Sequence, residues 1–244
     1  MPKFFVREEQ IKNDEILING RDFNHIVNVL RMKTGDRVNV CDIDSKINYI
    51  ANITEITDIV RCKIEERLNS NIEPETHITL FQGLPKADKM ELIIEKGTEV
   101  GVSEFIPVEM LRCVVKLDDK NKQKKLDRWQ KIAETAAKQS GRDYIPKLES
   151  VISIKNICNL VKNYDIVLLA YEDEKENNLK GKLISLVKGT RVAIIIGPEG
   201  GMDKTEVKSL IEAGVETVSL GKRILRTETA GLVMAANILY GLEG

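Results

Sequence analysis

The feature that most constrains the fold is a pair of short apolar runs, Asp165–Ala170 and Arg191–Ile196, each followed by a loop. Such runs are typical of strands covered on both faces, which occur mainly in parallel sheets flanked by helices. Further strands are predicted at 78–84 and 105–108. Helices are predicted at 88–100, 120–140, 152–161, 204–213 and 227–242. Strands that alternate with helices predict an α/β fold with a mostly parallel sheet.

Residues 1 to about 72 follow a different pattern. Short segments of mixed or alternating polarity, separated by turn residues, predict strands at 4–6, 15–18, 37–43, 49–56 and 60–66. One helix is predicted between Asp22 and Met32, where apolar residues fall at helical spacing. Five strands and one helix in so short a span predict a small β-barrel. The polar stretch 69–76 is predicted to be a linker, so we expect two domains, 1–72 and 73–244.

The net charge of −1 gives no global basic field that would indicate a nucleic-acid partner. The distribution of charge is uneven, because Arg112–Lys147 holds eleven Lys and Arg against five Asp and Glu, a local net charge of +6. Such a segment is typical of a surface that faces a polyanion, and a solvated helix face is the alternative.

The cysteines are scattered without Cys-x-x-Cys spacing: Cys41, Cys62, Cys113 and Cys158. With only two histidines in the chain, a zinc site is not expected, and free thiols suit a reducing compartment. The N-terminus lacks the apolar stretch of a signal peptide, and no apolar run approaches the length of a membrane span. We therefore expect a cytoplasmic protein that binds neither a metal nor a membrane.

The loop Gly197-Pro198-Glu199-Gly200-Gly201 directly follows the second apolar run. Ligands of open α/β sheets bind beyond the carboxyl ends of the strands, and glycines let the backbone approach them closely. A Walker A loop is excluded because Met202 stands where that motif requires glycine. Glu199 would repel a polyphosphate but suits a cationic ligand such as S-adenosylmethionine. Asp203 and Glu206 are expected to cap the next helix as a capping-box-like pair, and a plain tight turn is the alternative for the loop.

A second glycine-containing turn, Val218–Gly221, follows another short apolar run. Thr227 is predicted to be the N-cap of the last helix, and Arg226 stands just before it. A helix N-terminus beside Lys222, Arg223 and Arg226 is a good anion site, although arginines also bridge neighbouring acids for purely structural reasons.

Four motifs together resemble one known family. They are Ile195-Gly-Pro-Glu-Gly-Gly201, Leu220-Gly-Lys-Arg-Ile-Leu-Arg-Thr-Glu-Thr-Ala230, Lys86-Ala-Asp-Lys-Met-Glu91 with Glu95-Lys-Gly-Thr-Glu-Val-Gly-Val102, and Arg128-Trp129-x-Lys-Ile-Ala133 followed by Gln139-Ser-Gly-Arg142. Over nearly its whole length the chain resembles the ribosomal RNA small subunit methyltransferase E family, whose members methylate N3 of a uridine in 16S rRNA. The N-terminal barrel, with His25-x-x-x-Val-Leu-Arg31-Met, is similar to that family's PUA-like domain. One departure is Gly97, where the family more often has alanine.

The resemblance implies a SPOUT-type fold, in which the C-terminal segment threads through a loop to form a trefoil knot. It also implies a homodimer and a small-subunit rRNA partner, as free RNA or in an assembly particle. The implied cofactor is S-adenosylmethionine, held by three loops at the knot. The expected cofactor-binding residues are Leu169, Ala170, Tyr171, Glu172, Gly197, Pro198, Glu199, Gly200, Gly201, Leu220, Gly221, Ile224, Leu225 and Arg226.

Methyl transfer to uridine N3 requires loss of the N3 proton, and the resulting negative charge spreads onto the uracil oxygens. A guanidinium would stabilise that charge, so Arg226 is the expected catalytic residue and Glu228 is the candidate proton acceptor. The expected RNA-binding residues are Arg31, Lys86, Lys89, Gln139, Arg142 and Arg223. Lys86 and Lys89 are equally compatible with a solvated surface. Trp129 is interpreted as a core residue, and His25 as a surface or hydrogen-bonded residue.

Two alternatives stay open at this point. A SPOUT enzyme that methylates another RNA atom, a ribose 2′-oxygen or guanine, has the same fold. A non-catalytic RNA-binding or ribosome-assembly module would use the barrel and the basic helix for binding, and its glycine loops would be structural. Saturable binding of S-adenosylmethionine separates the enzyme from the module.

Overall fold

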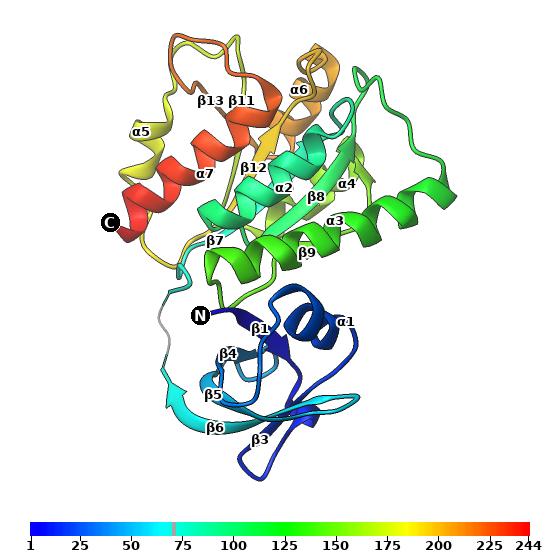
Figure 1. Cartoon of the computed structure of the whole chain (residues 1–244). Coiled ribbons are helices and arrows are strands. Elements are labelled where there is room, and N and C mark those ends of the chain that lie inside the picture. Colours follow the sequence, from blue (N-terminus) through cyan, green and yellow to red (C-terminus); the bar gives the residue numbers. More distant parts are fainter. Residues whose placement is uncertain (70–71) are drawn as a thin grey trace. The chain divides into compact units, whose positions relative to one another are not determined.

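A computed structural model of the chain describes residues 1–69 and 72–244 (Figure 1). The chain divides into an N-terminal unit, residues 1–73 with 137–144, and a C-terminal unit, residues 74–136 with 145–244. Each unit has its own core of buried apolar side chains. Residues 70 and 71, inside the predicted linker, lie outside the described residues. The segment 137–144 comes from the region that we predict to be the C-terminal domain, but it packs with the N-terminal unit.

The N-terminal unit is built on a curled six-stranded sheet with the order β1-β4-β5-β6-β3-β2. Its strands are β1 Lys3–Val6, β2 Ile11–Lys12, β3 Glu15–Ile18, β4 Arg37–Asp42, β5 Asn48–Ile56 and β6 Val60–Leu68. Alternate residues such as Val38 and Val40 are fully buried, because one face of each strand packs on the core. β1 and β4 pair in parallel, and the other neighbours are antiparallel. The five predicted strands are confirmed with shifted ends, and β2 is an addition.

The helix predicted between Asp22 and Met32 is shorter and less regular than expected. α1 covers Gly20–Asn24 and continues into a π-helical turn, His25–Val29. Ile26 is fully buried, so the amphipathic pattern anchors this turn to the core. The prediction of one α-helix to Met32 is wrong, because Arg31 adopts a left-handed conformation with φ 53° that ends the helical path.

The C-terminal unit contains a sheet with the order β10-β8-β7-β12-β11-β13, and β9 pairs with β8. Its strands are β7 His77–Gly83, β8 Glu104–Glu109, β9 Lys147–Leu148, β10 Ile152–Ser153, β11 Ile166–Ala170, β12 Arg191–Ile196 and β13 Glu216–Val218. The pairings between these described strands are all parallel, which confirms the predicted α/β fold. The two apolar runs are the neighbouring strands β11 and β12, and the residues from Val192 to Ile195 are fully buried. β9, β10 and β13 were not predicted as strands.

Helices cover both faces of this sheet (Figure 1). They are α2 Lys89–Val100, α3 Asp119–Ser140, α4 Ile154–Leu160, α5 Leu179–Leu183, α6 Lys204–Glu212 and α7 Thr227–Glu243. α2 and α7 pack side by side over one face, and α4 packs with α6 (Figure 1). Among the described residues, no helix combines the length and the apolar character that crossing a membrane requires. The short α5 was not predicted, and α4 is preceded by a strand where a continuous helix was expected.

Packing against the sheet explains why residue 97 of α2 is a glycine. A Cβ atom at this position would lie 2.7 Å from the ring of Phe105, a fully buried residue of β8. Such an approach is too close for two carbon atoms, so glycine lets α2 pack directly on the Phe105 ring. The departure from alanine at this position is therefore accompanied by close packing between this helix and the sheet.

Candidate active site

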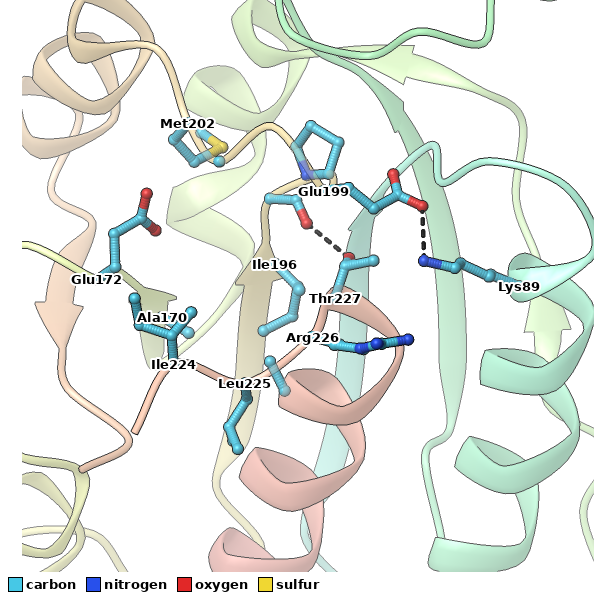
Figure 2. A pocket seen from close by; sticks show the side chains of 14 residues that line it. Lys89, Ala170, Glu172, Ile196, Glu199, Met202, Ile224, Leu225, Arg226 and Thr227 are labelled. Atoms are coloured by element: carbon cyan, nitrogen blue, oxygen red, sulfur yellow. Dashed lines mark hydrogen bonds and ion pairs between the residues drawn. The ribbon is translucent and has the colours of Figure 1, made fainter. Parts of the chain in front are cut away.

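A pocket of about 420 Å³ opens where β11 and β12 end and α7 begins (Figure 2). It is lined by Lys89, Ala170, Glu172, Ile196, Gly197, Pro198, Glu199, Gly201, Met202, Ile224, Leu225, Arg226, Thr227 and Ala230. A smaller hollow of about 120 Å³ shares Ala170, Glu172 and Leu225 with the pocket and adds Tyr171, Leu220, Gly221 and Arg223. The structure therefore brings the three predicted cofactor loops together. Leu169, fully buried, and Gly200 line neither space.

The glycine loop, Gly197–Gly201, is closely packed. Gly201 has φ 70°, and a Cβ atom there would lie 2.6 Å from a carboxylate oxygen of Glu172. A Cβ atom at Gly197 would lie 3.0 Å from the Met202 side chain. The left-handed conformation of Gly201 favours glycine, and the Glu172 and Met202 side chains would have to shift to admit a Cβ atom, so this loop is more specialised than a plain tight turn.

Arg112, which no motif of the sequence indicated as a site residue, braces the glycine loop from outside. Its Nη1 donates a hydrogen bond to the Gly200 carbonyl oxygen at 3.2 Å, and its Nη2 lies 3.5 Å from a carboxylate oxygen of Asp203. The only local signal was its position in the basic segment after β8. Its role depends on a contact between residues 88 positions apart, which no local pattern reveals.

The start of α6 differs in part from the prediction. The Asp203 side chain caps the helix as expected, since it accepts a hydrogen bond from the Thr205 backbone N–H at 3.0 Å. The predicted pairing with Glu206 is wrong, because Glu206 is buried and accepts a hydrogen bond from the Leu111 backbone N–H at 2.9 Å. The Glu206 carboxylate, predicted to help cap α6, thus binds the backbone of the loop after β8 instead.

The predicted N-cap role of Thr227 is also wrong. Arg226 occupies the N-cap position of α7, and Thr227 is the first helical residue. The Thr227 hydroxyl accepts a hydrogen bond from Nε2 of the buried Gln82 at 2.8 Å and donates one to the Gly197 carbonyl oxygen at 2.7 Å. This chain of hydrogen bonds joins the end of β7, the glycine loop and α7, and Figure 2 shows its link between Thr227 and the glycine loop. A polar residue at the end of an apolar strand was the signal for Gln82.

A charged cluster borders the pocket. The Lys89 ammonium lies 3.0 Å from Oε1 of Glu199 (Figure 2). It also lies 3.2 Å from Oε2 of Glu228. The Lys86 backbone N–H also donates to Glu199, at 3.0 Å. Arg226 lies 3.9 Å from Glu228, and its side chain is 84% exposed. Arg226 is therefore free to meet a ligand, whereas both glutamates are already engaged.

The cluster keeps its carboxylates ionised. Burial alone would raise the pKa of Glu199, but hydrogen bonds from the Lys86 N–H and from Lys89 lower it overall. The pKa of Glu228 is lowered by its backbone N–H at the start of α7, against a smaller effect of burial, and further by Lys89. The two carboxylates in turn raise the pKa of Lys89. All three groups are thus charged at neutral pH.

Glu172 faces the pocket from the other side (Figure 2). Within residues 1–69 and 72–244, no hydrogen bond or ion pair engages its carboxylate. An uncompensated carboxylate beside a partly apolar pocket favours a cationic ligand. The described residues hold no cluster of three or more His, Cys, Asp or Glu side chains placed to bind a metal ion.

The predicted RNA-binding residues fall into two groups. Lys86 and Arg223 are exposed in the C-terminal unit, and Arg31 and Gln139 are exposed in the N-terminal unit. The charged groups of Lys89 and Arg142 are instead bonded to carboxylates. RNA contact by all six residues stays a prediction. Trp129 is buried, as its interpretation as a core residue predicted.

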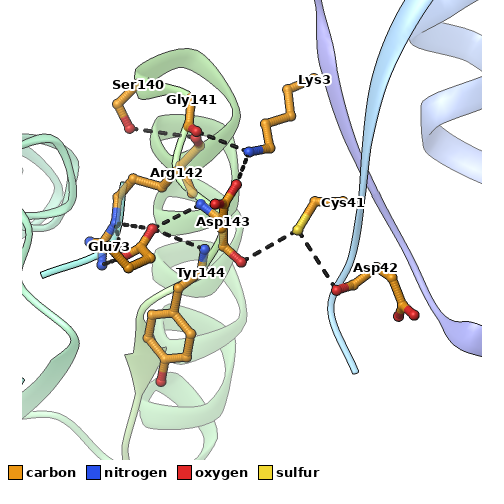
Figure 3. Close-up of polar contacts among 10 residues, drawn as sticks. Lys3, Cys41, Asp42, Glu73, Ser140, Gly141, Arg142, Asp143 and Tyr144 are labelled. Atoms are coloured by element: carbon orange, nitrogen blue, oxygen red, sulfur yellow. Dashed lines mark hydrogen bonds and ion pairs between the residues drawn. The ribbon is translucent and has the colours of Figure 1, made fainter. Parts of the chain in front are cut away.

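Arg142 belongs to a compact network in the N-terminal unit (Figure 3). The residue is 6% exposed, and its guanidinium donates to Glu73 through Nε at 3.1 Å and Nη2 at 2.6 Å. Lys3 pairs with Asp143 and donates to the Gly141 carbonyl oxygen at 2.9 Å. These contacts fasten the segment 137–144 to the sheet of this unit.

Comparison with known proteins gives the chain a family. Residues 72–239 match the family model of an RNA methyltransferase domain, and residues 18–67 match that of an RNA methyltransferase PUA domain. Ribosomal RNA small subunit methyltransferase E of Bacillus subtilis (strain 168) is 39% identical over 100% of this chain and 98% of its own length. The protein of the same name from Mesomycoplasma hyopneumoniae (strain 232) is 33% identical over 96% of this chain and 97% of its own.

Solved structures agree with this result. A ribosomal RNA small subunit methyltransferase E from Neisseria gonorrhoeae, bound to S-adenosyl methionine, has a TM-score of 0.87 and 27% identity, and covers 99% of this chain and 98% of its own. A methyltransferase from Legionella pneumophila in complex with the same cofactor has a TM-score of 0.87 and 28% identity, and covers 98% of this chain and 96% of its own.

A parallel sheet with a glycine-loop pocket, together with a curled β unit that matches a PUA model, defines an RNA methyltransferase. The two matches occupy most of the chain and follow each other in the expected order. The chain belongs to the ribosomal RNA small subunit methyltransferase E family. This result favours an enzyme over a non-catalytic RNA-binding module.

Proposed function

We propose that this enzyme transfers a methyl group from S-adenosylmethionine to N3 of a uridine in small-subunit (16S) ribosomal RNA. The observation that carries the proposal is the pocket itself, where three loops of the family's motifs and the exposed Arg226 meet. Relatives named for this activity, and the cofactor-bound structure from Neisseria gonorrhoeae, support the assignment.

The pocket residues suit the proposed cofactor. A volume of about 420 Å³ is in the range of small-molecule sites. The glycine loop offers backbone groups, while Ile196, Ile224 and Leu225 offer apolar surface. The Glu172 carboxylate matches the ammonium and sulfonium charges of S-adenosylmethionine. When bound, the cofactor supplies an electrophilic methyl group, so the protein's own task is to position the partners and to manage charge.

Arg226 and Glu228 are the proposed catalytic residues. The Arg226 guanidinium is exposed at the rim and can stabilise negative charge on the uracil oxygens. Glu228 is ionised, so its carboxylate can accept the N3 proton, although its lowered pKa makes it a weak base. Exposed Lys86 and Arg223 in the C-terminal unit, and Arg31 and Gln139 in the PUA-like unit, are proposed to bind the RNA.

We also propose the trefoil knot that the family resemblance implies. The backbone hydrogen bonds between the segment after β11 and the segment after β13 support it. The Leu179 N–H donates to the Ser219 carbonyl oxygen at 3.3 Å, and the Ser219 N–H donates to the Asn177 carbonyl oxygen at 2.8 Å. These bonds pair the two segments side by side, as the proposed threaded chain requires, although such chains are rare among folds.

We also propose a homodimer, because the family resemblance implies one, with the face formed by α5 and α7 as its interface. A hollow of about 560 Å³ lies there, and Ile184, Val187 and Tyr240 expose more than two-thirds of their surface around these helices. Exposed apolar side chains gathered on one face are typical of an interface. A Tyr240→Glu variant that stays dimeric in light scattering would argue against this face.

We propose a cytoplasmic location, because the proposed substrate is ribosomal RNA.

A radiolabelled methyl-transfer assay tests the function. Purified small subunits and free 16S rRNA, both lacking the modification, are incubated with the enzyme and labelled S-adenosylmethionine, and the product nucleoside is identified by mass spectrometry. We expect label in N3-methyluridine. Label in a 2′-O-methylnucleoside or in methylguanine would replace the proposed target atom, and no label on either substrate would contradict the proposal.

A further inference from the structure

Lys89 occupies a position that local electrostatics disfavours. It is the first residue of α2, where the positive end of the helix dipole repels a cation. The N-cap residue Asp88 makes no side-chain capping bond that would offset this repulsion. A lysine that keeps this position has a favourable partner elsewhere in the fold, and here the partners are Glu199 and Glu228.

The two glutamates come from separate parts of the chain. Glu199 lies in the glycine loop, and Glu228 lies in the first turn of α7. One ammonium contacts both carboxylates, at 3.0 Å and 3.2 Å. Without it, two negative charges would face each other across the pocket rim. Arg226 is no substitute, because it lies 3.9 Å from Glu228 and extends into solvent.

We propose that Lys89 is a positioning residue, which acts through Glu199 and Glu228 to hold the glycine loop and the start of α7 at the spacing that cofactor binding needs. The inference deepens the proposed function and rests on it. It replaces the expectation that Lys89 binds an RNA phosphate, because the ammonium is already shared by two carboxylates, of which Figure 2 shows that of Glu199.

The direction in which cofactor affinity changes when Lys89 is removed separates a positioning role from a purely electrostatic one. S-adenosylmethionine carries a net positive charge at neutral pH, whereas its demethylated product, S-adenosylhomocysteine, has none. If Lys89 acted only by its charge, its removal would strengthen binding of the charged donor and leave the neutral product unaffected. If Lys89 holds the loops together, its removal weakens binding of both ligands, and the loss for the product reports positioning without the effect of charge.

The chain offers a matched control on the same helix. Lys96 also bridges two glutamates, Glu95 and Glu99, at 2.8 Å each. All three residues lie within α2, outside the pocket lining. Lys96→Met therefore removes the same kind of bridge, with the same change in net charge, without separating the two cofactor loops.

The experiment is calorimetric titration of both ligands into the full-length wild type, Lys89→Met, Lys89→Gln, Lys89→Arg and Lys96→Met. We expect roughly tenfold weaker binding of both ligands to Lys89→Met and Lys89→Gln, an intermediate effect for Lys89→Arg, and wild-type binding for Lys96→Met. The Gln variant keeps the proposal testable if the Met variant does not fold.

Two results would overturn the inference. One is tighter binding of S-adenosylmethionine with unchanged binding of the product, which would indicate a purely electrostatic role. The other is unchanged binding of both ligands with a raised KM for RNA, which would return Lys89 to a phosphate contact. Failure of the wild type to bind either ligand would contradict the proposed function itself, so the two failures are distinguishable.

Discussion

Arg226 and Arg142 make an instructive pair, because sequence reasoning expected both to contact RNA or its reacting base. In the structure Arg226 is the N-cap residue of α7, with a side chain that is 84% exposed at the pocket rim. Arg142 is buried in the N-terminal unit and bonded to Glu73. The same residue type is thus free to meet a ligand in one place and holds a fold together in the other. Burial and partners decide which.

The two charged clusters around these arginines differ in the same way. The Lys3–Asp143 pair is almost completely buried, so each charge is stabilised by the other in place of water. The Lys89, Glu199 and Glu228 cluster is partly exposed, so water and ions share in stabilising its charges. A buried cluster should therefore control stability, whereas an exposed cluster beside a pocket can tolerate a ligand.

The largest expected effect concerns the buried cluster. Lys3→Met leaves Asp143 buried without its partner, which should lower the free energy of unfolding of the N-terminal unit by about 3–5 kcal/mol. Denaturant unfolding measures this change, and Lys12→Met, on an exposed residue, is the control. A loss below about 1 kcal/mol, the range of surface ion pairs, would remove the contrast between the clusters.

Arg226→Ala should affect chemistry and not folding. Removal of one group that stabilises developing negative charge typically lowers kcat by about 10²–10³-fold, and an exposed side chain contributes little to stability. Single-turnover methyl transfer and thermal unfolding measure the two effects. Wild-type turnover in this variant would end the catalytic role, and a large fall in Tm would make Arg226 resemble Arg142.

Gly201→Val tests how closely the pocket loop is packed. The substitution imposes a side chain at φ 70° and directs a Cβ atom to within 2.6 Å of Glu172, so affinity for S-adenosylmethionine should fall by roughly one to two orders of magnitude. Gly189→Val is the matched control, since Gly189 has φ 85° with open space around its Cβ position. Equal losses in the two variants would mean that backbone strain alone, and not the pocket contact, matters.

Near neutral pH the smallest expected effects concern titration, and the two regions should respond in opposite directions when the pH is moved away from neutrality. The pKa values of Glu199 and Glu228 are lowered in the folded state, so their stabilisation is complete above about pH 4.5, the ordinary glutamate pKa, and is lost as pH falls below it. Burial raises the pKa of Cys41 and Cys62 in the N-terminal unit to about 12. Their neutral form is favoured, so that stability is present below about pH 9 and is lost as pH rises toward 12.

Unfolding free energies measured across pH test both signs. A Cys41→Ala/Cys62→Ala variant should lack the decline in unfolding free energy above pH 9 that we expect of the wild type. A decline of the same slope in this variant would show that other groups cause the alkaline loss. In the same way, a Glu199→Gln variant should show a weaker decline below pH 4.5 than the wild type.

Much of the fold followed from local patterns. The apolar runs predicted β11 and β12, and the helical periodicities predicted α2, α3, α6 and α7 within a few residues. The short elements β9, β13 and α5 were missed, because two to five residues carry too little periodicity to stand out from a loop. The helix after Asp22 was extended too far, because the left-handed conformation of Arg31 has no sequence signal of its own.

The sequence predicted which loops form the candidate site, but it did not predict the contacts between them. The motifs placed Glu172, the glycine loop and Arg226 around one pocket, and the structure brings them together. The braces formed by Arg112 and Gln82 were missed, since each joins residues that lie far apart in the chain. The capping roles of Glu206 and Thr227 were misassigned for the same reason, because stronger distant partners take their polar groups.

The sequence by itself determined the alternation of strands and helices, the position of the glycine loops and the family, because these depend on periodicity and on motifs of neighbouring residues. Only the tertiary structure decided which charges are paired. Lys89 meets a glutamate 110 positions away and another 139 positions away, and Arg142 is taken out of solvent by Glu73. The energy of a charge depends on its distance to other charges and on its exposure to water, and both quantities arise only when the chain is folded.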